Sequence, residues 1–293
     1  MKVALFSAMR DRRSHQLAQE VVRFFAKRKI QLVSDDEGAA LLGIPLLSRS
    51  DASAVQFIIT MGGDGFILKI AHQYVDLDAA ILGINLGHLG FMADVGVEQF
   101  LPGLEALING HYTIQQRMML EGRANREDPF FSINDCVFHR AHHPNLVEVA
   151  LYVNEKFLNT FEADGMIIAT PNGSTAYSLA AGGPIVSPDL EAYIITPICP
   201  HTISNRPVVL PSDCHIRVQY VSQCRPIEVT ADGLHRFFLK SGESVHLQKS
   251  QKTFNLIHLG NIDYFSTLRT KLNWSGKLKP KKSSCSTSSL SEK

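Results

Sequence analysis

The sequence predicts an α/β amino-terminal domain with a parallel sheet and glycine-rich turns, followed by a β-sandwich-like carboxy-terminal domain. In the first part of the chain, apolar runs of strand length alternate with segments of helical period, which is typical of a parallel sheet covered by helices. From about residue 112 onward, apolar and polar residues alternate with the period of a half-buried strand. The expected boundaries are 1–112 for the first domain, 113–262 for the second, 263–275 for a helix that packs back on the first domain, and 276–293 for a disordered tail.

The first domain contains three apolar runs that are predicted to form its sheet. The strands are expected at 2–6, 55–60 and 80–84, with helices at 14–29 and directly after Gly65. Glycine-rich turns follow the last two strands, at 62–65 and 85–91. Because ligands of such sheets lie beyond the carboxyl ends of the strands, both turns are expected to face one crevice.

The second domain is predicted to consist of strands joined by short turns. Residues 147–153 alternate strictly, and Asn154 and Glu155 behind them indicate a turn. The same alternation recurs at 216–220, 227–229 and 245–247. The Ser- and Lys-rich tail has little apolar surface to bury, so no fold is expected there.

The composition excludes several classes of protein. The chain of 293 residues is 45% hydrophobic, and its net charge of +1 offers no overall field for nucleic acid. Five cysteines, an odd number without CxxC spacing, argue against a disulfide scaffold and against a structural zinc site. The charges at 10–13 come too early for a signal-peptide core, and no apolar run approaches the ~20 residues of a membrane span, so a cytoplasmic location is expected.

The turn Gly62-Gly63-Asp64-Gly65 is the most informative motif. A glycine-rich turn between a strand and a helix exposes backbone N–H groups where the helix dipole favours an anion, which makes it a natural phosphate site. A carboxylate in that place would repel phosphate on its own. The carboxylate has a role beside a phosphate if Asp64 takes a proton from a hydroxyl nucleophile, or if it holds a divalent cation on the phosphates.

Two segments of the second domain carry further polar groups. The strand 166–169 is followed by a segment, 170–184, whose Ser, Thr and Tyr side chains suit a nucleotide or a ribose; a simple Ser/Thr turn that caps a helix fits as well. Asn134 and Asp135 open another apolar run, and an adjacent amide and carboxylate can grip two ribose hydroxyls or the edge of an adenine. A turn before a strand is an equally good interpretation of that pair.

Taken together and in this order, these motifs resemble those of the NAD kinases. The resemblance extends from about residue 55 to 265 and includes Pro200-His201-Thr202-Ile203-Ser204-Asn205-Arg206-Pro207. It implies an α/β domain followed by a β-sandwich domain. It also implies transfer of a phosphoryl group from ATP, or polyphosphate, to the 2′-hydroxyl of the adenosine ribose of NAD, with a divalent cation, Mg²⁺, and a homo-oligomeric enzyme.

The resemblance also implies roles for individual residues. Asp64 matches the proton acceptor, and Asp164 matches an aspartate near the nicotinamide end. The substrate- and nucleotide-binding residues that it implies are Gly63, Gly65, Lys69, Asn134, Asp135, Asn145, Asp164, Thr175, Ala176, Tyr177, Ser178, Leu179 and Ala180. Two positions depart from the family pattern: Phe66 stands where a Thr is usual, and Asp135 is one methylene shorter than the usual Glu.

Other functions were weighed against this one. Lipid and sugar kinases share a similar glycine–aspartate turn, and a non-catalytic NADP(H) sensor would use the same scaffold. A hydrolase triad of Asp164, Ser174 and His201 is disfavoured because the G-x-S-x-G elbow is missing. The histidines at 139, 142 and 143 lack carboxylate or Cys partners at metal spacing, so a solvated loop is expected and no metal-ligating residue is predicted.

Overall fold

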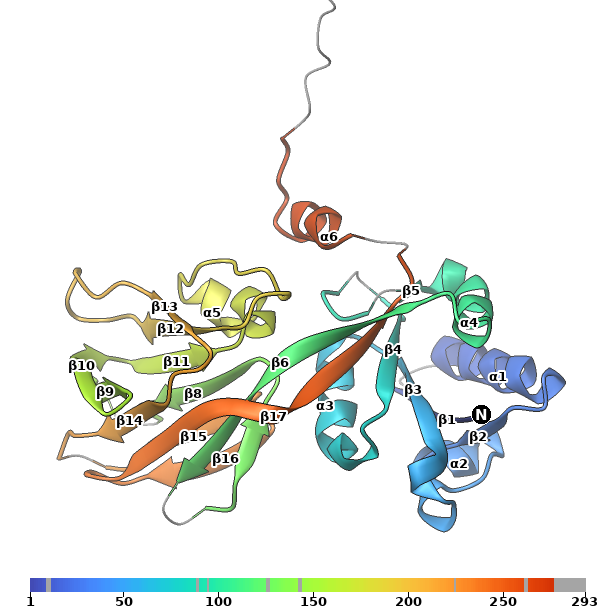
Figure 1. Cartoon of the computed structure of the whole chain (residues 1–293), viewed down its shortest axis with the longest axis horizontal. Coiled ribbons are helices and arrows are strands. Elements are labelled where there is room, and N and C mark those ends of the chain that lie inside the picture. The colour runs from blue at the N-terminus through green and yellow to red at the C-terminus, as the bar shows by residue number, and fades with distance from the viewer. Residues whose placement is uncertain are drawn as a thin grey trace, which may run out of the picture.

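The fold is described from a computed structural model of the chain. It describes residues 1–8, 12–87, 90–93, 95–124, 127–141, 144–223, 225–260 and 263–276. The predicted tail from 277 onward and the histidines 142 and 143 lie outside these residues. The predicted fold class is confirmed: an α/β domain precedes a domain of antiparallel sheets (Figure 1).

The amino-terminal domain is built on a parallel sheet in the order β4-β3-β1-β2. Its strands are β1 (Lys2–Ser7), β2 (Gln31–Val33), β3 (Val55–Met61) and β4 (Ala80–Asn85), with the short β5 (Val95–Gly96) beside β4. Its helices are α1 (Arg12–Lys27), α2 (Asp36–Leu42), α3 (Asp64–Gln73) and α4 (Phe100–Ile108). The three predicted strands and two predicted helices of this domain are all present.

Alternating side chains of the strands determine which helix covers which face. Val3 and Leu5 of β1 pack with α1 and α4, whereas Ala4 and Phe6 of the same strand pack with α3. Both faces of the sheet are therefore apolar, as expected for a sheet buried on two sides. The arrangement fixes the start of α3 at the carboxyl end of β3.

The carboxy-terminal domain consists of two antiparallel layers. A six-stranded sheet has the order β13-β12-β11-β8-β15-β16. Its strands are β8 (Asp135–His139), β11 (Gly165–Ala169), β12 (Ala192–Ile198), β13 (Val208–Pro211), β15 (Ile227–Ala231) and β16 (His235–Leu239). The facing layer contains β6 (Thr113–Ala124), β7 (Phe130–Ser132), β9 (Val147–Val153), β10 (Lys156–Ala163), β14 (Ile216–Tyr220) and β17 (Ser244–His258). Side chains of both layers form one core, in which Phe138 and Tyr193 meet Val149 and Leu247.

The long strands β6 and β17 join the two domains. β17 pairs with β6 along its length, with β14 near its start, and with Ile81 of β4 through Leu256 near its end. Figure 1 shows both strands passing from one lobe to the other. One continuous sheet of eleven strands therefore spans both domains. The sequence analysis expected a strand near 245–247 but not its extension to residue 258.

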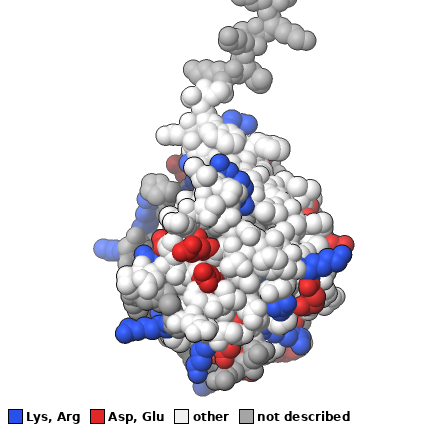
Figure 2. Space-filling model, turned by 90° about the vertical axis from the view of Figure 1, so that its left-hand side faces the viewer, with Lys and Arg blue, Asp and Glu red and all other residues white. Residues whose placement is uncertain are grey.

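The last helix, α6 (Tyr264–Lys271), starts at Asp263, whose carboxylate accepts the N–H of Ser266 at 2.9 Å. The ring of Tyr264 lies 6.4 Å from that of Phe91, and its hydroxyl lies 3.5 Å from the carbonyl oxygen of Val186. On the face shown in Figure 2, basic and acidic side chains are interspersed, as the balanced charge of the sequence predicts. Within the part of the chain described, no helix combines the length and apolar character needed to cross a membrane.

Candidate active site

The glycine-rich turn lies between β3 and α3, where the sequence predicts it. β3 ends at Met61 and α3 begins at Asp64. The N–H of Gly62 donates to the carbonyl oxygen of Ile84 at 2.9 Å, which ties the turn to β4. Gly63 and Gly65 are exposed, and a Cβ on either would meet no atom within 4 Å. The start of α3 is therefore uncrowded at these two glycines, at the positive end of the helix dipole.

A cleft of about 390 Å³ opens above this turn. It is lined by Ala8, Arg13, Ser14, Leu17, Gly62, Gly63, Gly65, Phe66, Asn85, Leu86 and Gly87. The two glycine-rich turns thus border one crevice, and Arg13 of α1 adds a positive charge to it. The sequence analysis missed Arg13, because nothing local places the start of α1 beside the end of β3. Lys69 is exposed on α3 and is not one of the lining residues. A larger hollow of about 920 Å³ between α1 and α4 contains none of the predicted site residues.

The carboxylate of Asp64 is held by the second glycine-rich turn. Its oxygens accept the N–H groups of Phe91, at 2.8 Å, and Met92, at 3.1 Å. Gly90 is buried beside it, and a Cβ on Gly90 would lie 2.0 Å from Oδ1 of Asp64. Asp64 is half-buried, so its carboxylate is oriented by the backbone and still borders solvent.

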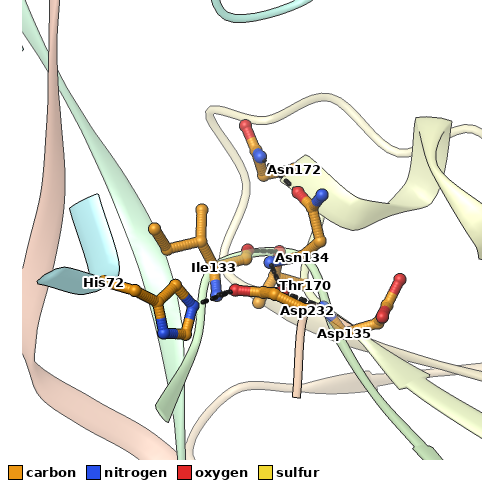
Figure 3. A network of polar contacts seen from close by, with 7 residues as sticks. All are labelled: His72, Ile133, Asn134, Asp135, Thr170, Asn172 and Asp232. Carbon is orange, nitrogen blue, oxygen red and sulfur yellow. Dashed lines mark hydrogen bonds and ion pairs between the residues drawn. The ribbon is translucent and has the colours of Figure 1, made fainter. Parts of the chain in front are cut away.

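The predicted pair Asn134 and Asp135 lies on a turn that a third carboxylate organises. Asp232 accepts the N–H groups of Ile133 at 2.7 Å, Asn134 at 2.8 Å and Asp135 at 3.0 Å, as Figure 3 shows. Its own N–H donates to the carbonyl oxygen of Asp135 at 3.0 Å. Asp232 follows β15 in the left-handed region, with φ 52°. The sequence analysis missed it, because an Asp-Gly pair after a strand indicates only a turn.

Asp135 has an unusual protonation equilibrium. The residue is buried, and burial first, with the nearby charge of Asp232 second, raises the pKa of its carboxyl to about 7. An ordinary Asp ionises near pH 4. Near neutral pH, this carboxyl therefore exists in both forms, one that donates a hydrogen bond and one that only accepts.

The second polar segment of this domain packs directly on the first. Asn172 donates to Oδ1 of Asn134 at 2.7 Å, and the N–H of Thr170 donates to the carbonyl oxygen of Asn134 at 2.8 Å. A Cβ on Gly173 would lie 2.1 Å from that carbonyl oxygen, so glycine is required for this close approach. The buried Arg117 lies 3.5 Å from Oδ1 of Asn172. The two segments that the sequence analysis singled out separately therefore form one network.

The short helix α5 (Tyr177–Ala180) presents the remaining predicted residues. Tyr177 is 43% exposed, which disfavours a role in the core. The hydroxyls of Ser174 and Ser178 are fully buried and bonded inside the protein, to Val186 and Thr196 respectively. Of this segment, Tyr177 and Ala180 are exposed, and Thr175, Ala176 and Leu179 are partly exposed.

Two predicted residues lie apart from this network. Asp164 precedes β11, whereas Asp135 pairs with Ala169 at the other end of that strand, about 16 Å from Asp164 at ~3.3 Å per residue. Asp164 forms an ion pair with Arg140 at 2.8 Å. Asn145 is exposed in the segment before β9.

One alternative interpretation, the hydrolase triad, finds no support in the geometry. The hydroxyl of Ser174 is fully buried, and His201 lies 3.7 Å from Glu162, so no Ser–His pair exists for a hydrolase. Among the described residues, no group of three or more His, Cys, Asp or Glu side chains is arranged to hold a metal ion.

Comparison with known proteins identifies the family of the chain. The sequence profile of the ATP-NAD kinase N-terminal domain matches residues 3–112, and that of the C-terminal domain matches residues 133–259. The chain is 48% identical over 277 residues to the NAD kinase of Protochlamydia amoebophila, which covers 94% of this chain and 99% of that protein. It is 36% identical to the NAD kinase of Geobacter metallireducens, over 93% of this chain and 98% of the relative.

Two solved structures share the fold. The yeast NADH kinase complexed with NADH has a TM-score of 0.82 at 24% identity and covers 95% of this chain and 89% of its own. The NAD kinase from Archaeoglobus fulgidus in complex with ATP has a TM-score of 0.74 at 23% identity, over 93% of this chain and 99% of its own. The profiles, the identities and the fold agree, and the chain belongs to the ATP-NAD kinase family.

Proposed function

We propose that the protein transfers the terminal phosphoryl group of ATP to the 2′-hydroxyl of the adenosine ribose of NAD, and that Asp64 accepts the hydroxyl proton. The bond between the 2′-oxygen and the γ-phosphorus forms as the bond from that phosphorus to the β-phosphate oxygen breaks. ADP leaves with the bonding electron pair, and the products are ADP and NADP. Because phosphoryl transfer is loose, positioning of the hydroxyl matters more than the basicity of Asp64.

One observation supports this assignment most strongly. The carboxylate of Asp64 is oriented by two backbone N–H groups, and the glycines on either side of Asp64, Gly63 and Gly65, line the cleft. The cleft would take the phosphates of ATP against the start of α3 and Arg13. A carboxylate next to these glycines would receive the proton of the acceptor hydroxyl.

A divalent cation, Mg²⁺, would be bound in this cleft with phosphate oxygens of ATP as ligands. Mg²⁺ is usually bound by one or two carboxylates together with substrate phosphates and water. Asp64, between the cleft-lining residues Gly63 and Gly65, would be the carboxylate in this role, and the described residues offer no group of His, Cys, Asp or Glu that could hold a metal ion without the phosphates. When bound, the cation would neutralise negative charge on the transferred group.

The NAD site is proposed around the network of Asn134, Asp135 and Asn172, with Tyr177 and the rest of 175–180 covering the nucleotide. Asp164 and Asn145 remain proposed contacts for more distant parts of NAD. Three further proposals rest on the sequence. They are the domain boundaries at residues 112 and 262, a homo-oligomeric state and a cytoplasmic location.

The direct test is turnover. Purified protein with ATP, Mg²⁺ and NAD should form NADP, measured with an NADP-specific dehydrogenase. Replacement of ATP by polyphosphate and of NAD by NADH defines donor and acceptor. A folded protein that binds NADP without forming it would be a sensor, and one that phosphorylates a lipid or sugar instead of NAD would be another kind of kinase; either result contradicts the proposal.

A further inference from the structure

His72 connects the proposed phosphoryl-transfer turn to the proposed NAD site. It lies in the last turn of α3, the helix that begins at Asp64, about 12 Å further along the helix axis at 1.5 Å per residue. Its Nε2 is 2.7 Å from Oδ2 of Asp232. The His72 side chain is 15% exposed and that of Asp232 is fully buried.

The His72 ring is fixed by a second contact. It stacks on Phe131 of β7, with ring centroids 4.3 Å apart and an angle of 17° between the planes. Phe131 lies two residues before Ile133, the first residue of the turn that Asp232 holds. Figure 3 shows the histidine approaching the carboxylate from α3, beside Ile133.

The carboxylate of Asp232 therefore receives four donors from two domains. Three are the successive N–H groups of 133–135, and the fourth comes from the His72 ring. A buried carboxylate is costly unless it is fully hydrogen-bonded, so loss of one donor weakens the whole arrangement. Because α3 carries Asp64 at its other end, the contact fixes the spacing between the proposed proton acceptor and Asn134.

We infer that His72 is a positioning residue for NAD, which acts through Asp232 on the turn that carries Asn134 and Asp135. The inference rests on the proposed function, because it concerns how the acceptor nucleotide is held relative to Asp64. His72 touches neither proposed substrate site directly. Loss of the His72 side chain should therefore weaken NAD binding selectively, because ATP is proposed to bind at the other end of α3.

The test uses two variants of the full chain. His72→Phe keeps an aromatic ring for the stack on Phe131 and removes the N–H donor, and His72→Gln keeps a donor at a similar reach. We expect His72→Phe to raise the KM for NAD about tenfold, while the KM for ATP stays within about twofold, since one hydrogen bond is worth about this much. His72→Gln should stay within about threefold of wild type for both substrates. His72→Leu repeats the test without a ring.

A control separates positioning from general stability. Leu68 lies one turn before His72 on the same helix, is buried in the core, and has a side chain that cannot form a hydrogen bond to Asp232. Leu68→Ala should lower the Tm at least as much as His72→Phe without a selective rise in the KM for NAD.

The outcomes distinguish the two proposals. If the wild-type protein forms no NADP, the proposed function fails. If the wild type is active and folded His72→Phe has an unchanged KM for NAD, or raises both KM values alike, the positioning role is overturned while the function stands. The same selective rise in Leu68→Ala, or no rescue by His72→Gln, would also overturn it.

Discussion

Gly90 lies against the carboxylate of Asp64, and a Cβ on residue 90 would sit 2.0 Å from Oδ1 and 2.7 Å from Cγ. The two residues belong to different glycine-rich turns, which follow β3 and β4. The contact explains how the second turn contributes to the site: it fills the space behind Asp64 with backbone, whose N–H groups at Phe91 and Met92 then hold the carboxylate.

Gly90→Ala is predicted to displace the Asp64 carboxylate. Its extra methyl group meets the functional end of Asp64, so we expect kcat to fall on the order of 10²-fold, the effect of about 1 Å of misplacement. Overpacking should cost about 1–3 kcal/mol of stability. Steady-state kinetics and a thermal melt measure both effects.

Gly96→Ala is the matched control for this change. Gly96 lies in β5, a few residues along the chain, and a Cβ there meets no atom within 4 Å. It should retain wild-type kcat. Equal activity of the two variants would show that the Gly90 contact does not position Asp64.

Asp64→Asn is predicted to keep the fold and NAD binding while lowering kcat by ~10²–10⁴-fold, the usual contribution of a positioned base. The amide retains one oxygen for the N–H groups of Phe91 and Met92 but cannot take a proton. Single-turnover formation of NADP and calorimetric NAD binding separate the two effects. Asp76→Asn, at a carboxylate that is 91% exposed, is the control for removal of a charge. Near-wild-type turnover of Asp64→Asn would remove Asp64 from the proposed mechanism.

The sequence predicts those parts of the fold and site that local patterns encode. Strands β1, β3 and β4 are short apolar runs, and the turn at Asp64 combines a strand, three glycines and a helical period within a few residues. The change of period near residue 112 likewise reports the antiparallel domain. Each of these signals lies within a short stretch of sequence and does not depend on contacts with residues far along the chain.

The parts that escaped prediction depend on contacts between distant residues. His72 and Asp232 are 160 positions apart, and neither has a local pattern that marks it as a partner. β17 continues through Lys249, Ser250, Gln251 and Lys252, where polar residues and a shift of register hide the strand period. The polar stretch is part of the sheet because β17 pairs with β6 on both sides of it.

Asp135→Asn is predicted to change how stability depends on pH. The pKa of this carboxyl is raised to about 7 in the folded protein, chiefly by burial, whereas an unfolded Asp ionises near pH 4. Below about pH 4 both states carry the proton. Between about pH 4 and 7 the folded state binds more protons than the unfolded state, so this group lowers the free energy of unfolding as pH rises, and its effect is complete above pH 7.

Asparagine does not ionise, so the free energy of unfolding of the variant does not fall in this way as pH rises. We expect Asp135→Asn to gain on the order of 2–4 kcal/mol over wild type between pH 4 and pH 8. Urea unfolding of both proteins across this range gives the difference directly, because groups elsewhere cancel. A difference that is constant with pH would contradict the raised pKa.

Tyr177→Ala is predicted to weaken NAD far more than ATP. The ring is 43% exposed at the start of α5, beside the network of Asn134 and Asn172 and among small neighbours. Such a ring is suited to packing on a base or capping a pocket. Its loss should cost about 1–3 kcal/mol of binding, or about tenfold to a hundredfold in NAD affinity. Because the side chain is not in the core, the Tm should hardly change.

Two further variants make the Tyr177 test specific. Tyr177→Phe keeps the ring and removes the hydroxyl, so it should bind NAD nearly as well as wild type if packing is the contribution. Phe238→Ala removes a 58% exposed ring from β16 and should leave NAD affinity unchanged. Calorimetric titration with NAD, beside a melting curve for each protein, provides the comparison. Unchanged NAD affinity in well-folded Tyr177→Ala would exclude the ring from the binding site.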